Sequence, residues 1–492
     1  MNRQRFFPHA LIVLTVARFL LLMSTELSPV EAHAALCSAR LEWWHPLTGP
    51  LLPLLMKPGM ALFGWNEFGV RFLAPLLILS AGWLVWRVAT GLFDGPVAGW
   101  AALFFQVTPV VNQASITFTN TTLGIFFSAL LLAVLRLALH HSHRLHLHWW
   151  AVAVSTCLAF LADWRLVALS FGGAASLTLT RRGRHAMLKW PVLPILAGSF
   201  ALTLTFFLAW NSEHGWSAFR FFPDSAQSHI GTLLWRLVLA FGPLLPVFAW
   251  ALVETALQRP LTYVPAFLYA FMWPLLALDM LAFHNMDWPQ AGFCAWLPPV
   301  VMLAALHVLH SEHLSPRTGV WLRSLILGIT ALQSIFLVRS GGASFLEANG
   351  NFWGWRASSA AIRKALEHEG LGGDGQIHFE TDEWQLAAPL SFYLHDLKTK
   401  RTEQSLPLIE TAPNATDRTP ELPWRRSANL SAAPQDTVIY ITNEESRHQP
   451  RRDLRERRPG WRAIAIFRVT HEGAPPRTLK VFACPPESAA HK

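Results

Sequence analysis

The chain has 492 residues, of which 52% are hydrophobic and only 14% are charged. An average soluble protein carries about 25% charged residues, so this composition excludes a large soluble enzyme, and the high apolar content excludes a disordered chain. The net charge of +9 is more typical of basic cytoplasmic loops than of nucleic-acid binding. Of the 71 charged residues, 39 follow residue 340. We therefore expect a membrane-embedded part, residues 1–340, a water-facing domain, residues 341–492, and no nucleic-acid partner.

Eleven apolar stretches in the first 340 residues are candidates for crossing a bilayer, which requires about 20 apolar residues per helix. The shortest two flank Asp163-Trp164-Arg165 and predict either two short helices joined by a tight turn or one irregular hairpin. The stretches are residues 9–25, 69–92, 96–113, 121–140, 148–162, 164–180, 188–210, 230–257, 260–282, 289–309 and 319–339.

The positions of the basic loops predict the orientation of these stretches. Arginine and lysine gather at the N-terminus and near residues 144, 181–189, 259 and 317, which all fall on the cytoplasmic side if eleven helices cross. The first outer loop, residues 26–68, and the domain after residue 340 then lie on the opposite side. An alternative interpretation makes residues 1–34 a signal peptide that would remove Glu31. We predict a multi-pass protein of a bacterial inner membrane with a periplasmic C-terminal domain.

Polar side chains recur in the predicted outer loops. The first outer loop begins ELSPVEAHAAL, and the loop after the seventh stretch reads WNSEHGWSAFRFFPDSAQSH. Asp163 and Arg165 follow the fifth stretch. Ionisable groups near membrane depth are costly and tend to be functional, although a structural Asp163–Arg165 pair explains these two residues almost as well. Together the loops predict a site for a charged group at the outer boundary. Within the first loop, residues 50–62 are apolar but interrupted by proline, which favours a helix lying along the interface.

These features resemble the bacterial GT-C glycosyltransferases of the protein O-mannosyltransferase and lipid A aminoarabinose transferase type, which are glycosyltransferase family 39-like. The resemblance implies a multi-span α-helical GT-C core of about eleven helices with a C-terminal soluble α/β domain. It also implies sugar transfer from a polyprenyl-phosphate donor to a lipid, glycan or protein acceptor. The stretches that carry it are LSPVEAH, ALFGWNEFGVRF, LAFLADWR, WNSEHGWSAFRF, MDWPQAGF and FETDEWQLAAPLSFYL.

The resemblance also implies roles for individual residues. Glu31 matches the second acid of the family's first-loop Asp-Glu pair, so it would deprotonate or orient the acceptor hydroxyl. A second group would bind the phosphate or the sugar, since fixed cations stabilise a departing phosphate. Its members are Arg71, Asp163, Arg165, His214, Arg220, Asp287 and Trp288. No cofactor is required, although Glu31, His33 and His214 could meet as ligands of a divalent metal.

Four positions depart from the family pattern. Val30 replaces the Asp of the first pair, and Thr48-Gly49-Pro50 replaces His-Pro-Pro. Thr119-Asn120-Thr121 replaces a Thr-Pro-Asp motif, and Asp163 replaces the Lys of a Ser-Lys-Tyr motif. These departures leave open a different sugar or acceptor, or a catalytically silent homologue that acts in binding or assembly. A lipid or solute transporter is a third alternative, but transporters usually contain inverted repeats and this sequence shows no internal repeat.

The last 152 residues have the pattern of a small α/β domain. Residues 357–368 and 383–394 are typical of helices. Four runs rich in β-branched and aromatic residues are typical of strands: 376–380, 437–442, 463–469 and 479–483.

Overall fold

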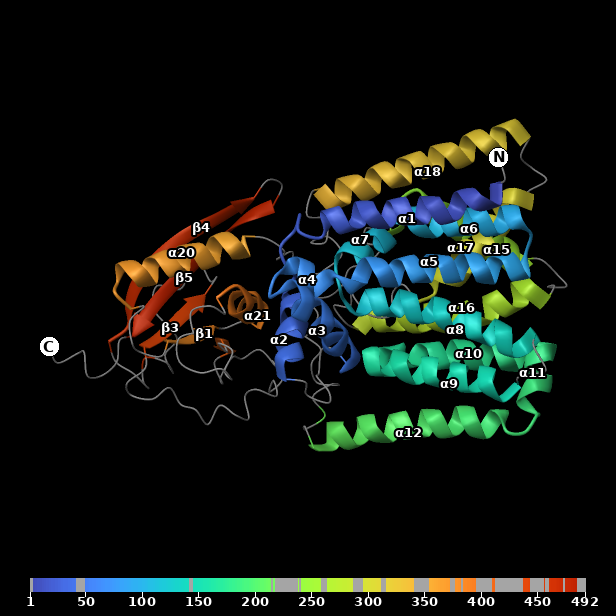
Figure 1. Cartoon of the computed structure of the whole chain (residues 1–492), viewed down its shortest axis with the longest axis horizontal. Helices are drawn as coiled ribbons and strands as arrows, with labels where there is room; N and C mark the ends of the chain where they lie inside the picture. The colour runs from blue at the N-terminus through green and yellow to red at the C-terminus, as the bar shows by residue number, and fades with distance from the viewer. Residues whose placement is uncertain are drawn as a thin grey trace. The chain divides into compact units, whose positions relative to one another are not determined.

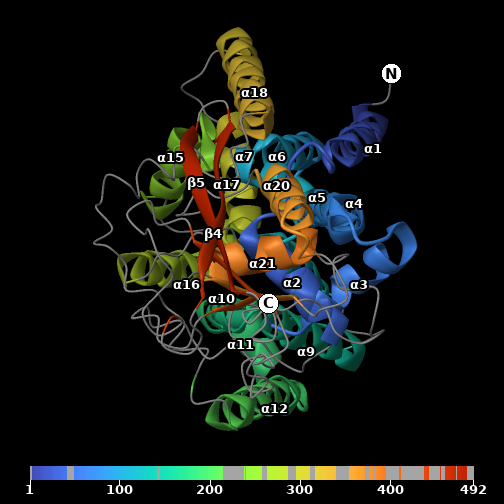
Figure 2. The ribbon, with the colours of Figure 1, turned by 90° about the vertical axis from the view of Figure 1, so that its left-hand side faces the viewer.

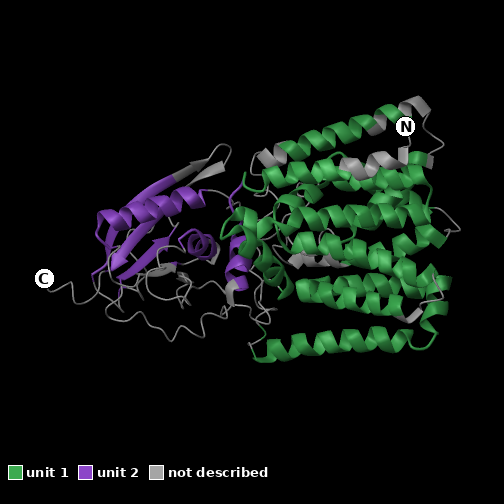
Figure 3. Ribbon diagram, viewed as in Figure 1, with its two compact units in different colours: residues 1–24, 48–216, 224–350 green, residues 25–47, 217–223, 351–492 purple. Residues whose placement is uncertain are grey.

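The structure is a computed structural model. It is mostly α-helical and contains one five-stranded sheet (Figure 1). The chain forms two compact units (Figure 3). The helical unit comprises residues 1–24, 48–216 and 224–350, and the sheet unit comprises residues 25–47, 217–223 and 351–492. The residues described are 3–40, 49–140, 145–213, 216, 238, 240–257, 263–285, 295–310, 316–339, 354–371, 377–381, 384–394, 409–411, 437–442, 455, 460–471 and 474–484.

The helical unit confirms the predicted multi-span α-helical class. Each of the eleven predicted stretches overlaps a helix, and the stretch 96–113 is divided between two. The first parts of the stretches 230–257 and 289–309 lie outside the described residues. The helices are α1 (Arg3–Leu21), α3 (Leu51–Phe63), α4 (Glu67–Arg71), α5 (Leu73–Leu92), α6 (Gly95–Val107), α7 (Pro109–Ile116), α8 (Asn120–His140), α9 (Leu145–Ala162), the 3-10 turn η1 (Trp164–Leu166), α10 (Val167–Leu179), α11 (Arg181–Met187), α12 (Val192–Glu213), α15 (Leu244–Leu257), α16 (Tyr263–Asn285), α17 (Leu297–His310) and α18 (Pro316–Arg339).

Several of these helices have the length and composition of membrane helices. Within the described residues, Glu67–Leu92, Asn120–His140 and Val192–Glu213 are long and apolar enough to cross a membrane, and shorter apolar helices accompany them. Helix α12 exposes large apolar side chains, including Leu202 at 64% and Phe206 at 66%. Such exposure on an apolar helix suits contact with lipid rather than with water.

Two local details of the helical unit answer questions that the sequence raised. Helices α9 and α10 are joined by η1, so the region around Asp163 is two short helices with a tight turn rather than one irregular hairpin. Helix α3 is a separate helix of 13 residues that runs across the ends of the bundle helices (Figures 1 and 2). This direction agrees with the predicted interface helix.

The break between α6 and α7 explains why one predicted stretch became two helices. Pro109 occupies the first position of α7, and proline restricts Thr108 before it to an extended conformation, so α6 ends at Val107. Buried carbonyls that a helix break leaves free need other hydrogen-bond donors. Phe104 O accepts from Thr108 Oγ1 at 2.6 Å, and Val107 O accepts from Ser334 Oγ of α18 at 3.0 Å. Side-chain hydroxyls therefore donate to the carbonyls that the break leaves free.

The sheet unit has the predicted α/β character. Its strands are in the order β2-β1-β3-β5-β4, with β2, β1 and β3 parallel and β5 antiparallel to both β3 and β4. All the predicted helices and strands are present, and β2 is a short additional strand. The elements are α2 (Pro29–Arg40), α20 (Trp355–His368), β1 (Ile377–Thr381), α21 (Trp384–Tyr393), β2 (Ile409–Thr411), β3 (Thr437–Thr442), β4 (Arg462–His471) and β5 (Ala474–Cys484).

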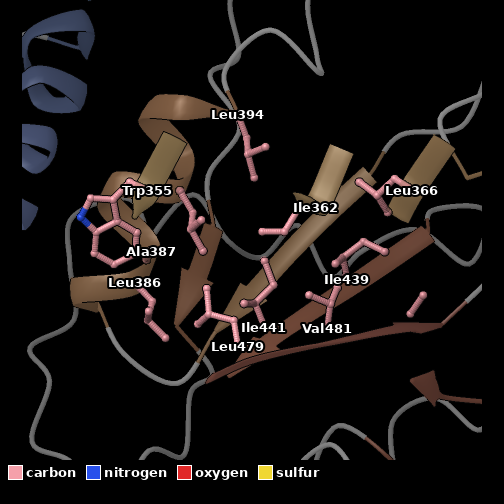
Figure 4. Packing of buried hydrophobic residues seen from close by; sticks show 12 residues of the cluster. Trp355, Ile362, Leu366, Leu386, Ala387, Leu394, Ile439, Ile441, Leu479 and Val481 are labelled. Carbon is pink, nitrogen blue, oxygen red and sulfur yellow. The ribbon is translucent and has the colours of Figure 1, made fainter. Parts of the chain in front are cut away.

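The core of the sheet unit lies between one face of the sheet and helices α20 and α21 (Figure 4). Alternate residues of a strand point to opposite faces. Ile439 and Ile441 of β3 accordingly face this core, whereas Tyr440 lies on the other face beside Phe482 and Trp461. The core residues are Trp355, Ile362, Leu366, Leu386, Ala387, Leu390, Leu394, Ile439, Ile441, Leu479, Val481 and Ala483.

Candidate functional site

Glu31 lies in the first turn of α2 and is completely buried. Its backbone N–H donates to Ser28 Oγ at 3.1 Å, and its carboxylate Oε2 accepts from the Ser28 N–H at 3.0 Å. This reciprocal pair is a capping box, which supplies partners to backbone N–H groups that a helix N-terminus otherwise leaves without acceptors. The arrangement fixes the rotamer of Glu31 and aims its carboxylate back toward the beginning of α2.

The residues beside Glu31 are buried as well. Val30, where the family pattern has Asp, is an apolar side chain only 7% exposed. His33 is 1% exposed, and its Nε2 lies 3.5 Å from the Sγ of Cys37. Within the described part of the chain, no three His, Cys, Asp or Glu side chains are placed to hold a metal ion. A metal held by Glu31, His33 and His214 stays a prediction, because His214 lies outside the described residues.

Asp163 is the hub of a second polar group, in the helical unit. Its side chain is 1% exposed, and the residue is the N-cap of η1. Oδ1 accepts from the Arg165 N–H at 2.9 Å and from Arg165 Nε at 2.7 Å, and Arg165 Nη2 donates to Oδ2. Oδ2 also accepts from Asn120 Nδ2 at 2.7 Å. Both carboxylate oxygens are therefore occupied, so Asp163 orients Arg165 and is poorly suited to act as a base.

Two of the departures from the family pattern meet in this group. Residues 119–121 replace a motif that ends in Asp, and Asp163 replaces a Lys, yet Asn120 and Asp163 form a direct hydrogen bond. In this chain Asp163 therefore supplies the carboxylate of the group, in place of the Asp of the family's Thr-Pro-Asp motif. Arg165 supplies the cation, in place of the family's Lys. The third departure lies nearby, since the Gly49 N–H donates to Ala162 O at 3.1 Å. A Cβ on Gly49 would lie 2.0 Å from Leu161 O, so only glycine fits at this close approach.

Replacing Asp163 with Asn should destabilise the protein by about 2 kcal/mol. Removing one partner of a fully buried ion pair costs roughly 3–5 kcal/mol, and the cost should be smaller here because Arg165 keeps 14% of its side-chain surface exposed. Thermal unfolding in detergent measures the effect. The matched control is Glu369→Gln, which breaks the more exposed bridge to Arg462 and should cost below about 1 kcal/mol. Equal losses in the two variants would show that Asp163 is not a structural hub.

Arg71, predicted to bind the donor, is the last residue of α4 and has no exposed surface. Its Nη1 donates to the carbonyl of Leu22, just after α1, at 3.0 Å. A guanidinium at a helix C-terminus interacts favourably with the last carbonyls. The described contact is therefore structural, and the role of Arg71 in donor binding stays a prediction.

The remaining predicted site residues are His214, Arg220, Asp287 and Trp288. All four lie outside the described residues, so their roles stay predictions.

The predicted site residues that the structure describes belong to two units. Glu31 belongs to the sheet unit, and Arg71, Asp163 and Arg165 belong to the helical unit. Within the helical unit, the structure joins Asp163 to Arg165. Two hydrogen-bond partners in these groups, Ser28 and Asn120, were not predicted from the sequence. The Ser-x-x-Glu spacing was a usable signal for Ser28, whereas no local pattern indicated Asn120.

Solved structures with a similar fold match nearly the full length of the chain. ArnT from Cupriavidus metallidurans in the apo state is 15% identical, with a TM-score of 0.59, and the match covers 96% of this chain and 97% of that chain. The structure of that protein bound to undecaprenyl phosphate is also 15% identical, has a TM-score of 0.60, and covers 96% of each chain. The oligosaccharyltransferase of Archaeoglobus fulgidus is 13% identical, with a TM-score of 0.50 over 78% of this chain and 64% of that one.

Sequence comparison agrees with the fold. No curated protein sequence matches the chain. The family described as dolichyl-phosphate-mannose-protein mannosyltransferase matches residues 45–210, a segment that includes Arg71 and the Asn120–Asp163–Arg165 group. The predicted resemblance is therefore confirmed: this chain has the fold of ArnT, and its residues 45–210 match the dolichyl-phosphate-mannose-protein mannosyltransferase family.

Proposed function

We propose that this protein is a membrane glycosyltransferase that moves a sugar from a polyprenyl-phosphate donor to a lipid, glycan or protein acceptor on the outer face of the inner membrane. The observation that carries the proposal is the combination of the family match over residues 45–210 with the ArnT fold over 96% of the chain. ArnT from Cupriavidus metallidurans binds undecaprenyl phosphate, which supports a polyprenyl-phosphate donor here.

The proposed reaction breaks the bond between the sugar C1 and the phosphate oxygen and forms a bond between C1 and the acceptor oxygen. The acceptor hydroxyl gives its proton to the Glu31 carboxylate, and the polyprenyl phosphate leaves with the electron pair of the broken bond. Negative charge grows on the leaving oxygen, so fixed cations there lower the barrier. Arg165, already oriented by Asp163, is the described candidate, and His214 and Arg220 would assist it.

Three further residues complete the proposed site. Arg71 and the pair Asp287-Trp288 would hold the sugar or the rest of the donor. No cofactor is needed for this chemistry, because the donor is already activated by its phosphate.

The proposal is tested by reconstituting the purified protein in liposomes with radiolabelled polyprenyl-phosphate sugars and candidate acceptors. We expect label to move from the donor lipid to one acceptor class, with release of free polyprenyl phosphate. Mass spectrometry of envelope glycolipids from a deletion strain identifies that acceptor. Uptake of sugar into the liposome lumen without a transferred product would instead support transport and overturn the proposal.

A catalytically silent homologue is the second candidate, and it is favoured by Val30, a buried apolar side chain where the family pattern has Asp. If no polyprenyl sugar is turned over by the wild type, and Val30→Asp restores nothing, the protein binds rather than transfers. Turnover by the wild type would show that transfer does not require an Asp at position 30.

A further inference from the structure

The carboxylate of Glu26 caps a helix that begins 329 residues later in the chain. Oε2 accepts from the Trp355 N–H at 2.5 Å, and Oε1 lies 3.4 Å from the Arg356 N–H. These are the first N–H groups of α20, which have no acceptor within the helix. The N-cap residue is Gly354, which has no side chain to supply one. A carboxylate also complements the positive end of the helix dipole, so Glu26 does what a local Ser or Asp does elsewhere.

The next residue makes a second attachment to the same unit. The Leu27 N–H donates to the hydroxyl of Tyr393 at 3.0 Å, and Leu27 is fully buried. Tyr393 ends α21, and its carbonyl accepts from Arg363 Nη2 of α20 at 2.7 Å. Helix α2 packs against α21. Both helices that cover the sheet are therefore joined to the segment that enters α2.

The position of the Glu31 carboxylate depends directly on these attachments. Glu26 and Leu27 are held by α20 and α21, Ser28 opens the capping box, and Glu31 closes it. We propose that Glu26 is a positioning residue, through which the sheet unit acts as the scaffold that holds the Glu31 carboxylate in place. This inference rests on the proposed function for its catalytic consequence, although the attachment itself can be measured without any activity.

Hydrogen exchange of the full-length protein tests the attachment. Glu26→Gln replaces the charged cap with a neutral amide, so we expect roughly tenfold faster exchange at the first turn of α20. We expect the same change across α2, residues 29–40. The matched control is Glu369→Gln, which breaks the Arg462 bridge of the same unit and should leave α2 unchanged. Faster exchange confined to α20 would make Glu26 a local cap and overturn the inference.

Kinetics test whether Glu26 acts through Glu31. Glu26→Gln should lower kcat for sugar transfer by roughly tenfold while leaving the donor KM unchanged, and Glu26→Asp should restore part of the rate because it keeps the carboxylate. In a Glu31→Gln background, Glu26→Gln should lower the rate no further. Independent, multiplicative losses would show that Glu26 does not work through Glu31. If the wild type transfers no sugar, the proposed function fails, and the exchange experiment still decides the scaffold.

Discussion

Replacing Glu31 with Gln should lower kcat for sugar transfer by about 10²–10⁴-fold, the usual contribution of a positioned general base. An amide cannot take the proton of the acceptor hydroxyl. It can, however, keep the capping box with Ser28, because Gln serves at this position as Glu does. The substitution therefore separates chemistry from folding, and initial-rate kinetics at saturating donor in liposomes measure it.

Ser28→Ala is the matched control for this experiment. It removes the hydroxyl that accepts from the Glu31 N–H and leaves the carboxylate in place. We expect it to cost about 1 kcal/mol of stability and less than about tenfold in kcat. If Glu31→Gln transferred sugar as fast as the wild type, the base would be another residue, and Glu31 would be only the cap of α2.

The sequence predicted the helices and strands well because their signals are local. Apolar run length and basic loops located the helices of the bundle, and β-branched runs located β1, β3, β4 and β5. The sequence missed β2, which has three residues and exists through its pairing with β1. It also missed the break at Thr108-Pro109, although the proline before α7 was a visible signal.

The polar contacts were less predictable, and the reason is their separation in the chain. Ser28 and Glu31 are three residues apart, so their capping box follows from the sequence pattern. The partner of Asp163 at position 120 and the helix capped by Glu26 depend on the fold, since no local pattern specifies them. Asn120 and Asp163 each depart from the family pattern. The structure explains both departures, because it places the two side chains in hydrogen-bond contact.

The same dependence on the fold applies to Arg18, an arginine within the first predicted apolar stretch, residues 9–25. Arg18 is 4% exposed near the end of α1. Nη1 donates to Gln106 Oε1 at 2.5 Å, and Nη2 donates to Gln106 O at 3.1 Å and to Asn112 Oδ1 at 2.8 Å. Within the described residues its partners are neutral oxygens at the break between α6 and α7. Gly82 makes room for this group, because a Cβ there would lie 2.1 Å from Gln106 Nε2.

Replacing Arg18 with Met should therefore destabilise the protein by about 3 kcal/mol, because two buried oxygens of Gln106 and the half-buried Oδ1 of Asn112 lose their donor. The stability of Arg18→Lys should lie between that of the wild type and that of Arg18→Met, since one ammonium reaches fewer of these oxygens than a planar guanidinium does. Denaturant unfolding in detergent micelles measures the order. Arg87→Met on α5 is the matched control: that guanidinium is exposed and lies over the Trp83 ring at 5.8 Å, so its loss should cost below about 1 kcal/mol. Equal stability of Arg18→Met and Arg87→Met would show that the broken helix finds other donors, and Arg18 would then be free to serve the substrate.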